Sequence, residues 1–197
     1  MPTRWEGLNP PYSTIVADPP WPIDQRPSVG RRNTVRDGQP NEMTFAPYST
    51  MSLGDIEGLR AGHLAAPDSH LYLWTVARYL REAYAVAEAW GFRVSQVLTW
   101  AKAPRGFSPG GIFGSTTEFC LFCRRGSLAA TDRPDSSWWN WPRLSHSVKP
   151  PAFYDLVERV SPGPYLELFA RQPRLGWDSW GWGYEKTDRF GEPSHAH

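Results

Sequence analysis

The sequence predicts an α/β fold in which a mostly parallel sheet carries helices on both faces. Short apolar runs rich in β-branched residues alternate with amphipathic helical patterns along the chain, which is typical of parallel sheets. At 197 residues the chain is long enough for one large core but not for two. Because no internal repeat or change in composition divides it, we expect a single domain over residues 1–183. The polar tail 184–197 is expected to be flexible.

The expected elements follow from periodicity and from the residues that end each pattern. Apolar runs predict strands over residues 12–18, 70–76, 94–100, 118–124 and 165–171, and a further one over 177–181. Helices are expected from Ser52, whose Ser-Leu-Gly-Asp start resembles a capping box, over 79–90 before Gly91, and after Pro150-Pro151. The segments 22–47, 103–117 and 127–146 lack periodicity and are expected to be loops.

Composition excludes several classes of protein. The net charge of +1 argues against a polyelectrolyte that binds nucleic acid by bulk charge, so any such contact must come from local patches. We expect no signal peptide and no membrane span, and therefore a cytoplasmic protein, or one of the host cytoplasm if a phage encodes it. The five histidines show no ligand spacing, and Cys120 and Cys123 lie on one expected strand, so we expect core thiols and no metal.

Asp18-Pro19-Pro20-Trp21 ends the first expected strand and is the most informative motif. In open α/β sheets ligands bind beyond the carboxyl ends of the strands, so this rigid turn places a carboxylate, a proline carbonyl and an indole at such an edge. Asp18 and the Pro19 carbonyl can each accept one N–H of an exocyclic amino group, while Trp21 stacks on the ring. This turn therefore suits alkylation of an amino nitrogen. The alternative is a purely structural turn, capped by Asp18 and packed by Trp21.

Two further features bear on substrate binding. The loop 22–47 holds the densest basic cluster, which could grip phosphates or simply be a solvated loop without a partner. Tryptophan is unusually abundant, with 11 residues, of which Trp138, Trp139 and Trp141 are clustered. Some of these must belong to the core, and others could be platforms on which bases stack.

Several motifs in a fixed order resemble one enzyme family. They begin with Asp18-Pro19-Pro20-Trp21 and continue with Pro47-Tyr48-Ser49-Thr50-Met51, Leu73-Trp74-Thr75, Ala89-Trp90-Gly91-Phe92, Trp100-Ala101-Lys102, His146-Ser147-Val148-Lys149-Pro150, Ser161-Pro162-Gly163, Glu167-Leu168-Phe169-Ala170-Arg171 and Gly176-Trp177-Asp178-Ser179-Trp180-Gly181. Over residues 12–183 the chain resembles the MT-A family of S-adenosylmethionine-dependent adenine-N6 methyltransferases, in a bacterial or phage form.

The resemblance implies a Rossmann-like methyltransferase fold in a permuted motif order, with the catalytic strand before the donor-binding strand. It implies that Asp18, Pro19, Pro20 and Trp21 are catalytic, with Trp21 against the target base. By position, the residues expected to bind S-adenosylmethionine are Ala17, Asp18, Lys149, Phe169, Arg171, Gln172, Arg174 and Trp182. Those expected to bind the substrate are Trp21, Arg31, Arg32, Arg36, Tyr48, Lys102 and Arg105.

The implied reaction is methylation of adenine N6 in nucleic acid, with DNA favoured over RNA and the base flipped out or single-stranded. A homodimer or a heteromeric partner is compatible with this size. Residues 172–174 and 182–183 depart from the family pattern, which leaves their contacts with the donor open. Two alternatives remain. Related turns serve cytosine-N4 or glutamine-N5 methylation, and a silent subunit that binds nucleic acid would share the fold.

Overall fold

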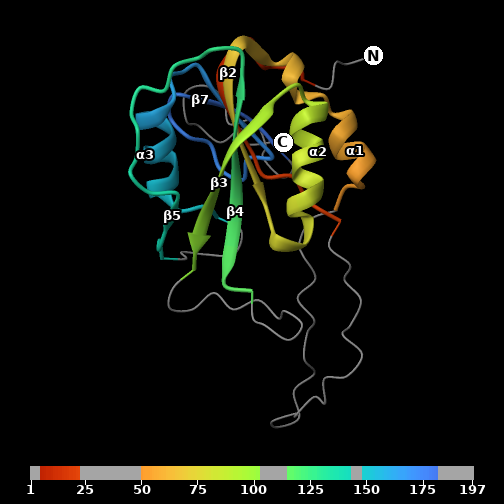
Figure 1. Cartoon of the computed structure of the whole chain (residues 1–197). Helices are drawn as coiled ribbons and strands as arrows, with labels where there is room; N and C mark the ends of the chain where they lie inside the picture. Colours follow the sequence, from red (N-terminus) through yellow and green to blue (C-terminus); the bar gives the residue numbers. More distant parts are fainter. Residues whose placement is uncertain (1–4, 23–49, 103–114, 143–147, 182–197) are drawn as a thin grey trace, which may run out of the picture.

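The computed structural model describes residues 5–22, 50–102, 115–142 and 148–181, whose strands form one seven-stranded sheet (Figure 1). Its strand order is β5-β3-β4-β2-β1-β6-β7. The strands are β1 (Tyr12–Ala17), β2 (Ala65–Thr75), β3 (Arg93–Ala101), β4 (Thr117–Arg125), β5 (Trp138–Trp139), β6 (Tyr165–Leu168) and β7 (Trp177–Trp180). The helices are α1 (Leu53–Gly58), α2 (Leu80–Ala89) and α3 (Pro151–Val160), with short 3₁₀ turns at Ala61–His63 and Ala77–Tyr79.

Most neighbouring strands run parallel, as predicted. β1 lies inside the sheet, next to the central strand β2, and pairs in parallel with β2 and β6. β6 pairs in parallel with β7, and β3 with β5. β4 is the exception, because it runs antiparallel to both β2 and β3. No helical pattern separates β3 from β4 in the sequence, so the chain returns along its neighbour without the crossover that a parallel pair requires. The amino end of β4 therefore lies beside the carboxyl ends of β2 and β3, at the sheet edge where β1 also ends.

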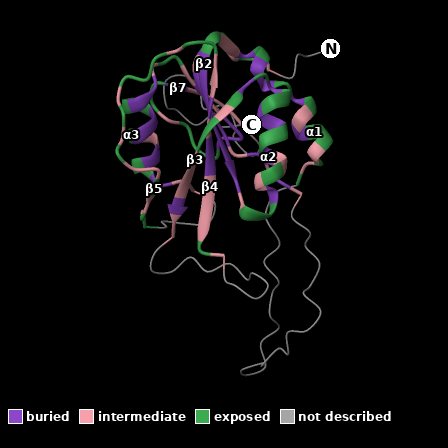
Figure 2. Cartoon of the chain, in the orientation of Figure 1, coloured by how far each residue is buried: buried purple, intermediate pink, exposed green. Residues whose placement is uncertain are grey.

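The helices cover opposite faces of the sheet, with α1 and α2 on one side and α3 on the other (Figure 1). Side chains on each strand alternate between two cores, and the strands are the most buried part of the molecule (Figure 2). Cys123 packs in the core under α2, whereas Cys120 packs in the core under α3. Both are buried free thiols, which confirms the prediction of core cysteines.

Local signals fix the ends of the helices where the sequence predicts them. The Ser52 hydroxyl caps α1 by accepting the Asp55 backbone N–H at 3.1 Å. Gly91 ends α2 with φ +84°, a conformation that favours glycine. Pro151 opens α3, where a missing N–H costs nothing. Among the described residues, no helix has the length and apolarity needed to cross a membrane.

Two boundaries differ from the sequence prediction by more than one residue, and one short strand is unexpected. β2 begins at Ala65 rather than at residue 70, where Ala65 pairs with Tyr12 of β1. The first residues of β2 form no apolar run, so the sequence pattern did not predict them as strand. The strand expected over residues 165–171 ends at Leu168, since Phe169 turns the chain with φ +65°. β5 lies in a segment that was expected to be irregular. A strand of two residues is too short to show a hydrophobic periodicity, so the sequence did not predict it.

Candidate active site

A pocket of about 330 Å³ lies at the carboxyl edge of the sheet, between the ends of β1 and β6 and the start of α3. This is the edge at which open α/β sheets bind ligands. Charged and aromatic side chains dominate its wall. The lining residues are Val16, Asp18, Trp74, Val148, Lys149, Pro151, Tyr154, Glu167, Phe169, Arg171, Gln172, Pro173, Arg174 and Leu175.

A chain of alternating charges runs from the pocket into the sheet. Lys149 Nζ lies 2.9 Å from Asp18 Oδ2 and 2.9 Å from Glu118 Oε2, and Glu118 also pairs with Lys102. The Lys149 side chain is only 9% exposed, whereas that of Asp18 is 26% exposed. The network thus holds three charges largely away from water and presents the Asp18 carboxylate to the pocket.

The electrostatics explain why these groups stay ionised. Burial alone would raise the pKa of Glu118, but the ammonium groups of Lys149 and Lys102 outweigh it and lower that pKa to about 2. Burial also disfavours the Lys149 cation, yet Asp18 and Glu118 raise the pKa of Lys149 above its usual range. Lys149 Nζ in addition lies 4.6 Å from the centre of the Trp74 ring, a cation–π contact. The Asp18 carboxylate therefore faces a permanently charged lysine.

A second cluster forms the other wall of the pocket. The Tyr154 hydroxyl donates to Glu167 Oε1 at 2.6 Å, and the Arg174 guanidinium lies 4.1 Å from the centre of the Tyr154 ring. Burial raises the pKa of Glu167, and the Tyr154 hydrogen bond partly opposes that shift. Arg174 also approaches Glu158, whose Oε1 accepts the Trp177 indole N–H at 2.7 Å. Tyr154 thus holds a carboxylate in a fixed orientation at the end of β6.

The turn after β6 is shaped by backbone geometry. Phe169 is buried at the pocket wall with φ +65°, which a residue with a Cβ rarely adopts. The Ala170 N–H donates to the Trp180 carbonyl at 3.0 Å, which ties the turn to β7. Gly181 permits this approach, because a Cβ there would lie 2.1 Å from the Ala170 carbonyl oxygen. This tie fixes where residues 171–175 start along the pocket.

The Asp-Pro-Pro-Trp turn is braced from both sides. The Trp21 N–H donates to the Pro19 carbonyl at 2.8 Å, and the Met51 N–H donates to the Pro20 carbonyl at 2.9 Å. The Trp21 indole is 4% exposed, donates to the Trp74 carbonyl at 3.0 Å and stacks on Tyr79. The expected contact between Trp21 and a target base is therefore corrected: Trp21 packs in the core and supports the turn from beneath.

The structure gathers most of the expected cofactor residues at one place. Asp18, Lys149, Phe169, Arg171, Gln172 and Arg174 all line the pocket. Ala17 does not, because its side chain points into the core on the opposite face and is fully buried. Lys102 was expected to bind substrate, but it is 12% exposed and paired with Glu118. The remaining expected residues, Trp182, Arg31, Arg32, Arg36, Tyr48 and Arg105, lie outside the described residues.

Sequence reasoning missed three residues at this site: Glu118, Trp74 and Tyr154. Glu118 opens β4, and only the antiparallel register of that strand brings it beside Lys149. Trp74 lies within an apolar strand and carries no polar signal, although it lines the pocket. Tyr154 occupies the stripe of α3 that faces the sheet, and its helical spacing alone marks it as a core residue.

The side chains that line the pocket favour one kind of ligand. Two carboxylates (Asp18 and Glu167) and three cations (Lys149, Arg171 and Arg174) line one pocket with several aromatic rings. Such a wall matches a ligand that carries a positive centre, a carboxylate, hydroxyl groups and a planar heterocycle, and S-adenosylmethionine has all four. The residues therefore fit this cofactor. Within the described ranges, no cluster of three or more His, Cys, Asp or Glu side chains could hold a metal ion.

Comparisons with known proteins agree with this chemistry. The MT-A70 family model matches residues 12–183. The type II methyltransferase M.MunI of a Mycoplasma species is 29% identical over 181 residues, which cover 86% of this chain and 76% of that protein. Human METTL4, an N(6)-adenine-specific methyltransferase, is 31% identical over 86% of this chain but only 37% of its own length.

A fungal relative is also similar. The N6-methyladenosine RNA methyltransferase MTA1 of Cryphonectria parasitica is 30% identical over 98% of this chain and 56% of its own length. The chain thus spans about a third to a half of these eukaryotic relatives. Since the family model matches nearly the whole of the described fold, the chain belongs to the MT-A70 family.

Proposed function

We propose that this chain methylates the N6 amino group of adenine in DNA, with Asp18 as the residue that binds and orients the target amino group. Membership of the MT-A70 family makes the chain an S-adenosylmethionine-dependent adenine-N6 methyltransferase. The proposal concerns the polymer, the residues that act and their roles. The observation that carries it is the partly exposed Asp18 carboxylate at the pocket, held by Lys149 at 2.9 Å.

When bound, S-adenosylmethionine supplies an electrophilic methyl carbon on a sulfonium sulfur. Glu167, fixed by Tyr154, faces the pocket where a carboxylate can accept from ribose hydroxyls. Arg174 and Arg171 line the adjoining wall, where cations can attract the carboxylate of the methionine part. The pocket volume of about 330 Å³ lies within the range of pockets that bury small ligands.

Asp18 acts on the target nitrogen by accepting one of its N–H groups. Lys149 occupies Oδ2, and a carboxylate has acceptor sites on both oxygens, so Oδ1 can accept the amino group. The Pro19 carbonyl already accepts the Trp21 N–H, but its second lone pair can accept the other hydrogen of the amino group. Two such bonds draw the nitrogen lone pair out of conjugation and direct it toward the methyl carbon. Catalysis then rests on positioning and on electrostatics.

No dedicated base is needed for this transfer. The thioether that leaves is neutral, and the methylated amino group loses its proton readily. Lys149 keeps its charge at neutral pH, so its part is to hold the Asp18 carboxylate and not to exchange a proton. The chemistry accordingly requires an intact Asp18–Lys149–Glu118 arrangement. A silent subunit has no need to preserve this arrangement, which favours an active enzyme.

We favour DNA because one relative that this chain covers over most of its length, 76%, is a bacterial type II methyltransferase. A base inside a duplex cannot reach a pocket at a sheet edge, so the target adenine must be flipped out or single-stranded. We also propose that the protein acts in the cytoplasm, and that a second copy or a different subunit supplies any longer recognition sequence.

The test is incubation with labelled S-adenosylmethionine and, separately, single-stranded DNA, duplex DNA and RNA, followed by nucleoside analysis. We expect N6-methyladenine in DNA. Label in RNA alone would overturn the choice of polymer, and label in cytosine would overturn the choice of base. A Lys149→Met variant removes the partner of Asp18 without touching the acceptor itself, and we expect it to form N6-methyladenine more slowly than the wild type.

A further inference from the structure

A short segment before β1 lies against one face of the edge strand β7. Trp5 and Leu8 are half-buried and pack on the core under α2, whereas the residues around them are exposed. The Trp5 ring lies 4.8 Å from the Trp180 ring of β7, at an angle of 60°. The Leu8 N–H donates to the Trp5 carbonyl at 3.3 Å and closes a turn. Trp5 precedes residues 12–183, so the family match does not account for this contact.

A chain of hydrogen bonds ties the same segment to β7 a second time. The Asn9 N–H donates to the Tyr12 hydroxyl at 2.8 Å, and that hydroxyl donates to Asp178 Oδ2 at 2.5 Å. Burial and the Asp178 carboxylate raise the pKa of Tyr12, so the hydroxyl keeps its proton and remains a donor. Asp178 and Trp180 are two positions apart on β7 and therefore face the same side of the sheet. The segment is thus fixed on this face of β7 at two points.

The contact of Trp5 continues through Trp180 to the wall of the pocket. The Trp180 ring packs edge-on against the Phe169 ring, with centres 5.6 Å apart. The Trp180 carbonyl accepts the Ala170 N–H at 3.0 Å, so the side chain and the backbone of Trp180 both hold the turn after β6. Phe169 has φ +65°, and such a backbone persists only where its surroundings hold it. Loosening Trp180 should therefore loosen this turn.

The pocket wall that follows the turn depends on a few anchors for its position. Residues 171–175 all line the pocket, yet most of them are exposed and they belong to no helix or strand. The Arg174 guanidinium is held over the Tyr154 ring, 4.1 Å from its centre. The start of the wall is set by the bond from Ala170 to Trp180. A small shift of Trp180 therefore moves the groups that face the cofactor.

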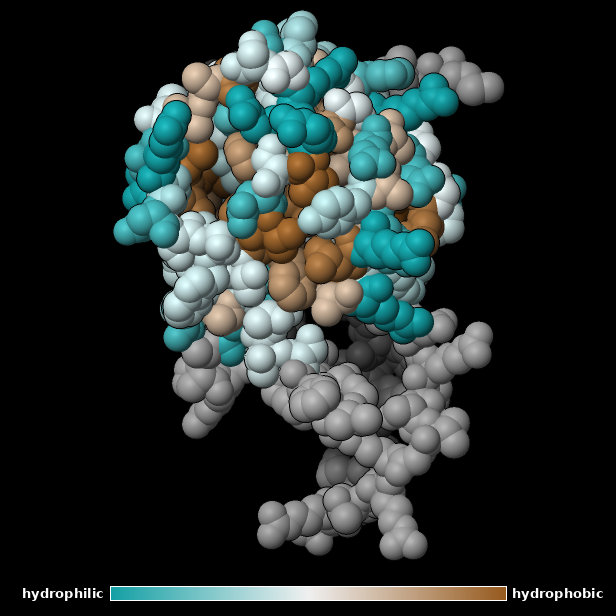
Figure 3. All heavy atoms as spheres, viewed as in Figure 1, coloured by the Kyte–Doolittle hydropathy of each residue, from teal (hydrophilic) through white to brown (hydrophobic). Residues whose placement is uncertain are grey.

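Covering apolar surface is an alternative role for the segment. Among the described residues, the surface over β3 and β4, between α3 and α2, is apolar in the space-filling view (Figure 3). These strands lie toward the other end of the sheet from β7. Because the fold leaves apolar surface exposed there, cover alone is a weaker reason for Trp5 to lie on Trp180 than support of the turn.

We propose that Trp5 is a positioning residue for the cofactor pocket and that it holds the turn at Phe169 and Ala170 through Trp180. This inference rests on the proposed function, because it takes the pocket to be the site of S-adenosylmethionine. Trp5 does not line the pocket, so its effect reaches the cofactor through the turn. Loss of the Trp5 ring should weaken cofactor binding and leave transfer from the bound cofactor nearly unchanged.

The experiment measures the Kd of S-adenosylmethionine for the full chain by calorimetry, and KM and kcat with the nucleic acid that the wild type methylates. The contribution of one aromatic pair changes an equilibrium by about twofold to about tenfold. Trp5→Ala should raise the Kd and the KM for S-adenosylmethionine within this range, while kcat at saturating cofactor stays close to that of the wild type. Trp5→Phe keeps a ring on Trp180 and should recover most of the affinity.

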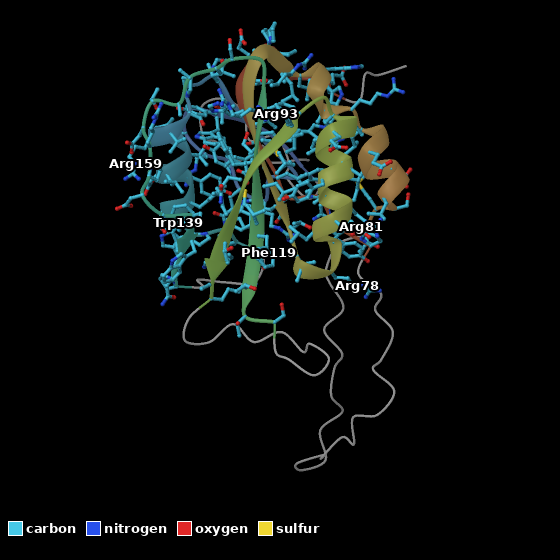
Figure 4. The ribbon with its side chains drawn as sticks, viewed as in Figure 1. Arg78, Arg81, Arg93, Phe119, Trp139 and Arg159 are labelled. Atoms are coloured by element: carbon cyan, nitrogen blue, oxygen red, sulfur yellow. The ribbon has the colours of Figure 1, made fainter. Side chains whose placement is uncertain are left out.

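Trp139→Ala is the matched control, because it also removes a half-buried indole from a pair of rings. Trp139 stacks on Trp141 with ring centres 5.1 Å apart, and it lies on β5, at the other end of the sheet from β7 (Figure 4). Trp139 does not line the pocket. Both alanine variants should melt at a lower temperature than the wild type, but Trp139→Ala should bind S-adenosylmethionine like the wild type.

An unchanged Kd in Trp5→Ala would overturn the inference. Equal weakening in Trp5→Ala and Trp139→Ala would also overturn it, because it would indicate a general loosening of the fold. So would a lower kcat with an unchanged KM, since loss of folded enzyme reduces the number of active sites without changing their affinity. Wild-type affinity for S-adenosylmethionine in both Arg174→Met and Glu167→Ala would instead refute the assignment of the cofactor to this pocket.

Discussion

Replacing Glu118 with Gln tests the buried charge network most quantitatively. The carboxylate of Glu118 is 18% exposed and pairs with both Lys149 and Lys102. The pKa of Glu118 falls from an ordinary 4.5 to about 2. A shift of one pKa unit corresponds to about 1.36 kcal/mol of free energy. The ionised group therefore stabilises the folded state by about 3 kcal/mol near neutral pH. Removing one member of a buried ion pair lowers the free energy of unfolding by a similar amount.

The sign of the pH dependence follows from the direction of the pKa shift. Because the folded-state pKa lies below the unfolded one, the stabilisation is complete above about pH 4.5 and disappears as the pH falls toward 2. Urea unfolding at neutral pH should show Glu118→Gln less stable by about 3 kcal/mol, with the gap narrowing below about pH 4.5. The reasoning is refuted if the two proteins unfold at the same urea concentration at pH 7, or if their gap stays constant across the acid range.

The remaining predictions address other parts of the molecule. Burial lowers the pKa of His70, so the unfolded chain binds a proton at this side chain more readily than the folded chain does. The melting temperature should therefore fall as the pH drops below about 6.5. The fall should be smaller in His70→Gln than in the control His63→Gln. Tyr154→Phe removes the hydrogen bond that orients Glu167 and should weaken S-adenosylmethionine binding about tenfold by calorimetry, whereas unchanged affinity would remove Glu167 from the cofactor site. Binding to DNA should weaken steeply with salt, and a flat salt response in a titration would argue against phosphate contacts.

The parts of the fold and site that could be predicted are those with local signals. An apolar run that ends at Asp18-Pro19-Pro20 predicts a strand and its edge, and Ser52 and Gly91 mark helix ends through their own backbone preferences. Lys149 could be placed near the pocket because its motif, His146-Ser147-Val148-Lys149-Pro150, resembles that of the family. In each case the residue and its structural consequence lie within a few positions of one another.

The parts that could not be predicted depend on register between distant segments. Glu118 reaches Lys149 only because β4 runs antiparallel and pairs with its neighbours in one register, and the sequence does not reveal that register. The indole of Trp21 looks equally suited to stacking on a base or to packing in a core, and its contact with Tyr79 decides the matter. Polar networks that cross the sheet therefore had to be read from the structure.

The account stands on Asp18 as the acceptor of the target amino group, and the rate of methyl transfer by Asp18→Ala tests it most directly. We expect N6-methyladenine formation to fall by about a hundredfold or more, because an oriented electrostatic contact at the reacting atoms is lost. Asp18→Ala should remain folded in a melting experiment and should still bind S-adenosylmethionine through the other pocket residues, with Asp55→Ala as a surface control. An Asp18→Ala enzyme that methylates adenine at the wild-type rate would contradict the account.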